Sequence, residues 1–157
     1  MLPRGLDQSI HPFLPQPLRP DFLWPGGKRV AAYVLLHIEH TEIVQPDDAH
    51  RDPRLAAERH PELIAACAAQ AHEPVAHGFS ASRMVTAQMT EEEERAHIVT
   101  AQDGLGRVWP GATGWLGQDH GATARSTHLL RDAGFEFSLD WANDEEPYLH
   151  ASGLIAM

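Results

Sequence analysis

HEPVAHGFSASR, residues 72–83, gathers two histidines, a glutamate, two serines and an arginine near the middle of the chain. The pattern differs from the His-Glu-x-x-His zinc motif, in which a helix carries two imidazoles one turn apart on one face. Here His72 and His77 are five residues apart, and Pro74 between them disfavours a continuous helix. A short strand at residues 75–76 fits better. We therefore predict that His77 projects where a strand meets a loop, a frequent place for chemistry in α/β folds.

Strand-like and helical segments alternate along the rest of the chain. Strands are predicted at residues 29–38, 75–76, 112–117 and 135–141, and helices from about Pro61, from Thr90 to about Gly104 and from about Thr123 to Gly134. Such alternation indicates an α/β fold with a parallel sheet covered by helices.

The N-terminal part of the chain differs from the rest in its proline content and its predicted structure. Residues 1–27 contain six prolines, which favour an extended arm, and residues 28–157 are predicted to form the folded domain. The run RVAAYVLLHI, residues 29–38, is nearly all apolar and rich in strand formers, so we expect a strand buried on both faces. Residues 43–54 are acidic and punctuated by proline, which predicts a loop.

The helix predicted from Thr90 has a clear beginning. Thr90 and Glu93 match a capping box, in which each side chain bonds the other residue's backbone. The acidic run Glu91–Glu94 is interpreted as the solvated start of this helix, where negative charge is favourable.

Polar residues follow four of the predicted strands. They lie at residues 37–42, 77–83, 118–120 and 140–145. The carboxyl ends of parallel strands meet at one edge of a sheet, which is where ligand crevices form. The sequence thus predicts that residues 72–83 form one wall of a shared site.

Composition narrows the possible partners. The chain has 157 residues, and 22 acidic against 12 basic residues give a formal charge of -10, which opposes binding to nucleic acid or to anionic membranes. No apolar run is long enough to span a bilayer, and the proline-containing N-terminus does not resemble a signal peptide, so a cytoplasmic location is expected. Cys67, the single cysteine, is expected to be a buried, inert thiol on a helix.

Five motifs occur in an order that resembles a known family. They are WPGGKRVAAYVLLHIEH (24–40), HPELIAAC (60–67), HEPVAHGFSAS (72–82), GWLG (114–117) and LLRDAGFEFSLDWANDEEPY (129–148). The set resembles the polysaccharide deacetylase (NodB-homology) family, particularly its allantoinase-like branch, from about Pro12 to the end of the chain. The resemblance implies a partial, irregular (β/α) barrel of the NodB type. It also implies hydrolysis of a non-peptide C–N bond in a small-molecule amide, such as an N-acetylated sugar or a ureide like allantoin.

The resemblance also bears on a metal cofactor. Metal-dependent members use an aspartate after the first strand and a His-x-x-x-His pair as ligands. Here Glu39 stands at the aspartate position and His77 begins the second motif, but Ala81 replaces its partner histidine. A catalytic zinc normally has three protein ligands, so we expect no metal. If zinc or another divalent metal does bind, Glu39 and His77 are its expected ligands, with His40 as a possible substitute.

The resemblance assigns three catalytic roles. Glu39 would activate a water, His77 would protonate the leaving nitrogen, and Asp140 would assist electrostatically or orient a histidine. Each has a plainer alternative: a loop acid paired with His37 or His40 for Glu39, a histidine that ends a strand for His77, and a helix cap or salt bridge for Asp140.

Five further residues are expected to contact the substrate: His40, Ser82, Arg83, Trp115 and Trp141. Trp115 could instead be ordinary core packing. Asp119 and His120 could provide another acid–base pair, although QDHG favours a turn.

The chain departs from the family pattern in ways that open a second hypothesis. A helix and a strand are missing between Glu42 and Arg59, and further strands would be expected after ASGLIAM, residues 151–157. A shortened sheet leaves open edges, which self-association into a homo-oligomer would cover. The alternative to an enzyme is therefore a catalytically inactive relative that acts as a binding or assembly module.

Overall fold

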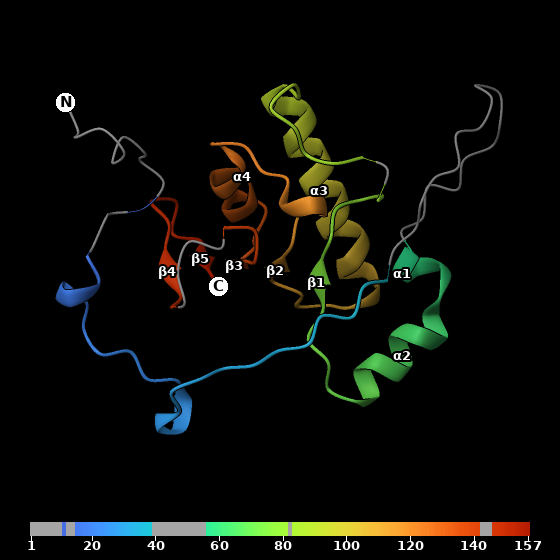
Figure 1. The fold of residues 1–157 in the computed structure, drawn as a ribbon. Coiled ribbons are helices and arrows are strands. Elements are labelled where there is room, and N and C mark those ends of the chain that lie inside the picture. The colour runs from blue at the N-terminus through green and yellow to red at the C-terminus, as the bar shows by residue number, and fades with distance from the viewer. Residues whose placement is uncertain (1–10, 12–14, 39–55, 82, 142–145) are drawn as a thin grey trace.

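The computed structural model describes residues 11, 15–38, 56–81, 83–141 and 146–157, and shows helices packed on one open sheet (Figure 1). The strands are β1 (Val75–Ala76), β2 (Gly114–Trp115), β3 (Phe137–Ser138), β4 (Tyr148–Leu149) and β5 (Ile155–Ala156). The α-helices are α1 (Ala56–Arg59), α2 (Pro61–Ala69), α3 (Glu91–Val108) and α4 (Ser126–Asp132). Short 3₁₀ turns lie at η1 (Gln16–Leu18), η2 (Pro25–Gly27) and η3 (Gln118–His120).

The strand order of the sheet is β1-β2-β3-β5-β4. β1, β2, β3 and β5 run parallel, and β4 pairs antiparallel with β5. Helix α3 connects β1 to β2, and α4 connects β2 to β3, as in a repeated strand–helix–strand unit. The prediction of an α/β fold with a parallel sheet is confirmed. The β4–β5 hairpin was not predicted from the sequence.

A compact core lies between the sheet and the helices α3 and α4. Trp115 of β2 is 1% exposed and stacks edge-on against the fully buried Phe135, with ring centroids 5.4 Å apart. Ile98 of α3 and Leu130 of α4 complete this layer, each 1% exposed. The burial of these large side chains is the main favourable contribution to folding here.

Helix α3 begins as its capping box predicts. The Thr90 hydroxyl accepts a hydrogen bond from the Glu93 amide at 3.2 Å, and the Thr90 amide donates to the Glu93 carboxylate at 2.8 Å. The Thr90 amide and, at 3.0 Å, the Thr90 hydroxyl both donate to the Glu93 carboxylate, which holds the pKa of Glu93 below its usual value. The helix then continues to Val108, one turn beyond the predicted end.

The interpretation of the whole acidic run as solvated is wrong for its last residue. Glu94 is 0% exposed, because it lies one turn before Ile98 on the side of α3 that faces the core. Its carboxylate accepts hydrogen bonds from Arg125 Nε at 2.8 Å, from the Thr123 hydroxyl at 3.0 Å and from the Ser126 hydroxyl. The buried charge is thus compensated by the segment that leads into α4.

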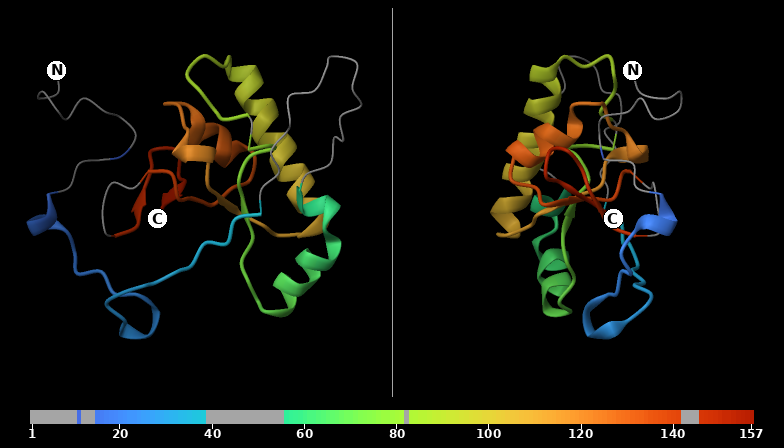
Figure 2. Two further views of the ribbon diagram at one scale, coloured as in Figure 1. Left: turned by 45° about the vertical axis from the view of Figure 1, so that its right-hand side comes forward. Right: turned by 90° about the vertical axis from the view of Figure 1, so that its left-hand side faces the viewer.

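The strand predicted at residues 29–38 does not form. This segment is extended but belongs to no strand, and Val30, Val34 and Leu36 are 77, 94 and 73% exposed. It passes on the side of the sheet away from α3 (Figure 2). A strand needs a hydrogen-bonded neighbour, and β1, the edge strand of the sheet, pairs only with β2 among the described residues. The apolar run therefore lies exposed instead of buried on both faces.

None of the helices in these described ranges is both long and apolar enough to cross a membrane.

Candidate active site

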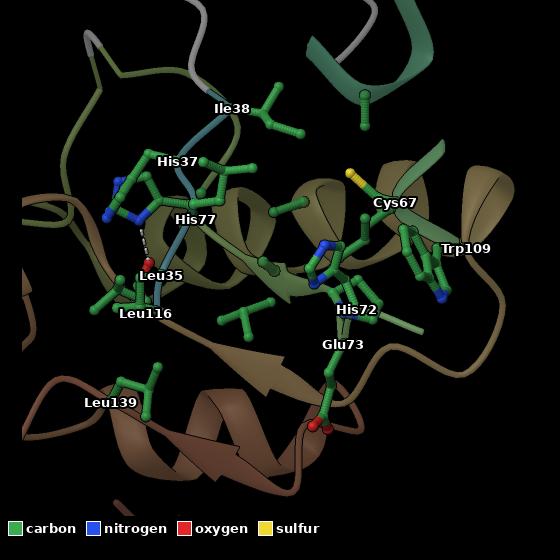
Figure 3. Close-up of a pocket in the computed structure, with 18 of the residues that line it drawn as sticks. Leu35, His37, Ile38, Cys67, His72, Glu73, His77, Trp109, Leu116 and Leu139 are labelled. Carbon is green, nitrogen blue, oxygen red and sulfur yellow. Dashed lines mark hydrogen bonds between the residues drawn. The ribbon is translucent and has the colours of Figure 1, made fainter. Parts of the chain in front are cut away.

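His77 lies immediately after β1, where the sequence predicted a strand-to-loop junction. Its ring nitrogen Nδ1 lies 2.7 Å from the carbonyl oxygen of Leu116, at the end of the neighbouring strand β2 (Figure 3). A carbonyl can only accept, so Nδ1 carries the proton and donates it. This tautomer leaves the lone pair on Nε2, which is then the nitrogen that can take up a proton or bind a ligand.

Gly78, the next residue, lets a second polar side chain approach. Gly78 has a φ of +75°, and a Cβ atom there would lie 2.1 Å from Nε2 of Gln118. Gln118 is 4% exposed, and its Nε2 donates a 2.8 Å hydrogen bond to the carbonyl oxygen of Ser80. This glutamine therefore ties the loop after β1 to the segment after β2.

Gln118 was not among the predicted site residues. QDHG does form a turn, the 3₁₀ turn η3, and its Asp119 and His120 are exposed with left-handed backbones. The one signal that sequence offered for Gln118 was its place directly after GWLG.

Asp140 follows β3 and is held by two neighbours. Its Oδ1 accepts a 2.6 Å hydrogen bond from the Gly117 amide, and its Oδ2 accepts one of 3.1 Å from the Ser138 hydroxyl. Burial raises the pKa of the Asp140 carboxyl, although the Gly117 amide, the Ser138 hydroxyl, the nearby His120 and the Trp115 indole each act to lower it. A raised pKa in a buried carboxyl is found at functional sites and also in structural hydrogen-bond networks.

Two consecutive residues thus hold both candidate catalytic side chains. Leu116 accepts from His77 through its carbonyl, and Gly117 donates to Asp140 through its amide. Since β1 and β3 flank β2, the end of the central strand brings the loops after both neighbours to one edge of the sheet. The predicted convergence of His77 and Asp140 is what the fold produces.

The remaining predicted site residues differ in burial and position, and three of them lie outside the described residues. Glu39, His40 and Ser82 lie outside the described residues. Trp115 is buried in the core, where it supports Asp140 and stacks against His97 with centroids 6.4 Å apart. Arg83 is exposed on the loop after β1. Trp141 is half-buried, its carbonyl accepts a 2.9 Å hydrogen bond from the Tyr148 hydroxyl, and its ring lies 6.2 Å from that of His150.

A second histidine lies beside His77. The rings of His37 and His77 pack edge to face, with centroids 5.1 Å apart. His37 belongs to the extended segment before Glu39, so this segment reaches the site even though it forms no strand.

A cavity of about 690 Å³ lies beside these two histidines, and Figure 3 shows residues that line it. One wall is the extended segment, residues 33–38, and the others come from α1, α2, α3, the sheet and the chain on either side of β1. His37, His77, Leu35 and Leu116 lie at one end, and Cys67 and Trp109 at the other. Cys67 is only partly buried and lines this cavity, so the expectation of a buried thiol is wrong.

The described residues do not supply the donor set of the metal site that the resemblance implies. Ala81, where a second histidine would stand, has no donor atom, and the described residues contain no cluster of three or more His, Cys, Asp or Glu side chains suited to a metal ion. A catalytic zinc site normally has three protein ligands. We therefore assign no step to a metal.

Comparison with solved structures identifies the fold. A protein from Mycobacterium smegmatis assigned as a polysaccharide deacetylase aligns with a TM-score of 0.57 and 25% identity, over 64% of this chain and 36% of that one. PuuE allantoinase and a protein from Pseudomonas aeruginosa PAO1 assigned as a polysaccharide deacetylase each align with a TM-score of 0.54 and 25% identity, over 65% of this chain and 35% of theirs. The chain has a partial NodB-like fold.

The NodB-like domain spans about a third of the length of these solved structures. Its sheet is open among the described residues, as expected for part of a barrel. The predicted resemblance to the polysaccharide deacetylase and allantoinase structures is confirmed. No family model matches the sequence, and no curated protein matches it.

Proposed function

We propose that the NodB-like domain belongs to a hydrolase that cleaves a non-peptide C–N bond. The observation that carries this proposal is the pair of backbone anchors at Leu116 and Gly117, which hold His77 and Asp140 at one edge of the sheet. The likeness to two assigned polysaccharide deacetylases and an allantoinase supports the same reaction class.

The chemistry divides among three side chains. A water oxygen attacks the carbonyl carbon of the amide, the C–N bond breaks, and the leaving nitrogen takes a proton. His77 supplies that proton from Nε2, the nitrogen opposite its bond to Leu116, after Nε2 has taken up a proton from solvent to form the imidazolium. Asp140 provides negative charge near the reacting groups. Glu39, which lies outside the described residues, is the proposed base that takes the proton from the water.

The substrate follows from the same likeness. An N-acetylated sugar or a ureide such as allantoin is the proposed substrate class, with no role for nucleic acid or membrane and with the cytoplasm as the proposed location. Because the chain spans about a third of its structural neighbours, the rest of the site is proposed to come from segments outside the described residues or from a second copy.

A second candidate is a non-catalytic binding or assembly module. The exposed apolar side chains of the extended segment favour it, since Val30, Val34 and Leu36 would be buried by association with another protein surface. Ala81, at the position where metal-dependent members of the family have a histidine, also favours a non-catalytic role.

Product release separates the two candidates. The purified chain is incubated with N-acetylglucosamine oligomers and with allantoin, and acetate or ring-opened product is quantified. We expect turnover by the wild type and a drop in kcat of about 10²-fold or more for His77→Gln, as for loss of a general acid. His128→Gln, an exposed histidine on α4, serves as the matched control and should leave the rate unchanged. Equal rates for wild type and His77→Gln would refute the assignment.

A further inference from the structure

The cavity beside His77 has a largely apolar lining, unlike a site that binds sugar hydroxyls. Its walls are mostly alkyl and aromatic side chains, among them Leu35, Ile38, Leu116, Phe137, Leu139 and Met157, although the hydroxyl-bearing Tyr33, Ser80 and Thr113 also line it. A sugar hydroxyl or a ureide N–H placed against such walls would lose its bonds to water without replacement. An apolar group placed there gains from leaving water.

The charges that line the cavity also restrict which ligands it can bind. Among the described residues, the cavity is lined by the carboxylates of Glu73 and Glu136 and by no lysine or arginine. The whole chain also carries a formal charge of -10. An anionic ligand would therefore meet repulsion without a compensating partner.

Size favours a small molecule as the occupant. About 690 Å³ falls within the range of ligand pockets, roughly 300–1,000 Å³, and one end offers the polar groups of His37 and His77. A protein partner would instead need a surface of roughly 800 Å² on each side.

We propose that this cavity binds the apolar part of a neutral amide and presents its amide bond to His77. The cavity is then a subsite that favours a neutral aryl or alkyl substituent over an anionic one, and an N-acetylated sugar or a ureide would present its amide to His77 without filling it. Binding rests on the cavity alone, whereas cleavage of the bound amide rests on the hydrolase function proposed above.

Cys67 offers a reporter of occupancy that is independent of catalysis. It is the single cysteine of the chain, it is partly buried, and it lines the far end of the cavity. A ligand that fills the cavity should slow the reaction of Cys67 with a thiol reagent such as Ellman's reagent.

The test compares ligands that differ in one property at a time. Acetanilide is neutral and apolar, 4-acetamidobenzoate adds a carboxylate to the same ring, and N-acetylglucosamine and allantoin are neutral and polar. With acetanilide at ten times its Kd we expect about tenfold slower labelling, and no protection from the other three compounds at the same concentration. Protection by N-acetylglucosamine, allantoin or 4-acetamidobenzoate equal to that by acetanilide, or no protection by acetanilide, would overturn the proposal.

Two matched variants test whether the protection of Cys67 depends on ligand binding in the cavity. Leu35→Asp places a carboxylate in the apolar wall and should weaken acetanilide binding about tenfold. Val30→Asp lies on the same extended segment but outside the cavity lining, and should leave protection unchanged. Equal losses in both variants would overturn the placement. Labelling that slows with protein concentration alone would also overturn it, because a second copy would then be the occupant.

Release of aniline is measured on the same samples. Protection with aniline release supports both proposals. Protection without release supports the binding site and counts against the hydrolase function. Hydrolysis of N-acetylglucosamine oligomers or allantoin without protection by acetanilide would overturn the binding proposal while the hydrolase function stands.

Discussion

The backbone amide of Gly117 donates a 2.6 Å hydrogen bond to Oδ1 of Asp140, joining the ends of the adjacent strands β2 and β3. The residue before Gly117 accepts from His77, so one peptide segment positions a histidine on one side and a carboxylate on the other. This arrangement depends on the register of three parallel strands. It is the feature on which the proposed chemistry depends.

Asp140→Asn should change stability in a pH-dependent way. Burial raises the pKa of Asp140 above the usual 3.8, so the folded state retains the proton longer than the unfolded state does. The stabilisation that this gives is present below the unfolded pKa and is lost as pH rises through the folded pKa. Asparagine keeps an oxygen for the Gly117 amide without the charge, so the variant should gain stability relative to wild type between acidic and neutral pH.

Urea unfolding at about pH 3.5 and pH 7 measures this difference in the free energy of unfolding. Asp119→Asn, at an exposed aspartate of η3, is the control and should show the same small difference at both pH values. A loss of stability for Asp140→Asn that grows toward neutral pH would contradict the raised pKa.

Gly78→Ala should destabilise the chain through a close contact. Both Gly78 and Gly134 have left-handed backbones, with φ of +75° and +93°, so alanine strains either position. A Cβ at Gly78 also meets the Gln118 amide at 2.1 Å, whereas nothing lies within 4 Å at Gly134. We expect Gly78→Ala to cost about 1–3 kcal/mol more than Gly134→Ala, the usual range for a packing overlap. Equal costs in urea unfolding would show that Gln118 does not pack on Gly78.

Glu94→Ala should be among the most damaging single changes in α3. It removes a buried carboxylate and leaves the Thr123 and Ser126 hydroxyls without the acceptor to which they donate. Arg125, which is 37% exposed, keeps access to water. We expect a loss of roughly 3 kcal/mol, the low end for breaking a buried ion pair. Glu92→Ala, at an exposed position two residues earlier, should change stability by less than about 0.5 kcal/mol. A similar small change in both variants would mean that the Glu94 network contributes little.

His97 should make the stability fall at mildly acidic pH. Burial is the largest cause that lowers its pKa below 6.5, the Arg83 charge adds to it, and Glu94 opposes it. The unfolded chain therefore binds a proton first, so the stability present above pH 6.5 is lost as pH falls through the folded pKa. His97→Phe retains an aromatic ring against Trp115 and removes the titration.

The comparison is made by thermal unfolding between about pH 7.5 and pH 5.5. Wild type should lose stability relative to His97→Phe over this range, whereas His128→Gln, at an exposed histidine, should follow wild type. Parallel curves for wild type and His97→Phe would rule out a lowered pKa at His97.

The sequence predicted the elements whose signals are local. The capping box at Thr90 and the helix stop at Gly134 depend on residues a few positions apart, and both features occur in the structure. His77 at a strand end followed from Pro74 and the short apolar pair before it. These signals were sufficient for the parallel sheet and for its polar edge.

The features that sequence missed depend on distant partners. Glu94 is buried because Arg125, 31 residues away, neutralises it, and Gln118 is buried because it meets Gly78 and Ser80 from another loop. Nothing in the acidic run or in QDHG indicates these contacts. The apolar run at 29–38 has the composition of a strand, but composition cannot show whether a neighbouring strand exists to pair with it.

The tautomer of His77 is the most direct test of the proposed acid–base site, because it depends on the anchor to Leu116 and requires no knowledge of the substrate. Two-bond ¹H–¹⁵N correlation spectra of the histidine rings, assigned by comparison with His77→Gln, distinguish the two neutral forms. We expect neutral His77 to carry its proton on Nδ1 and its lone pair on Nε2. A proton on Nε2 would contradict it, because Nδ1 could not then donate to Leu116 and the acid–base site would not be assembled.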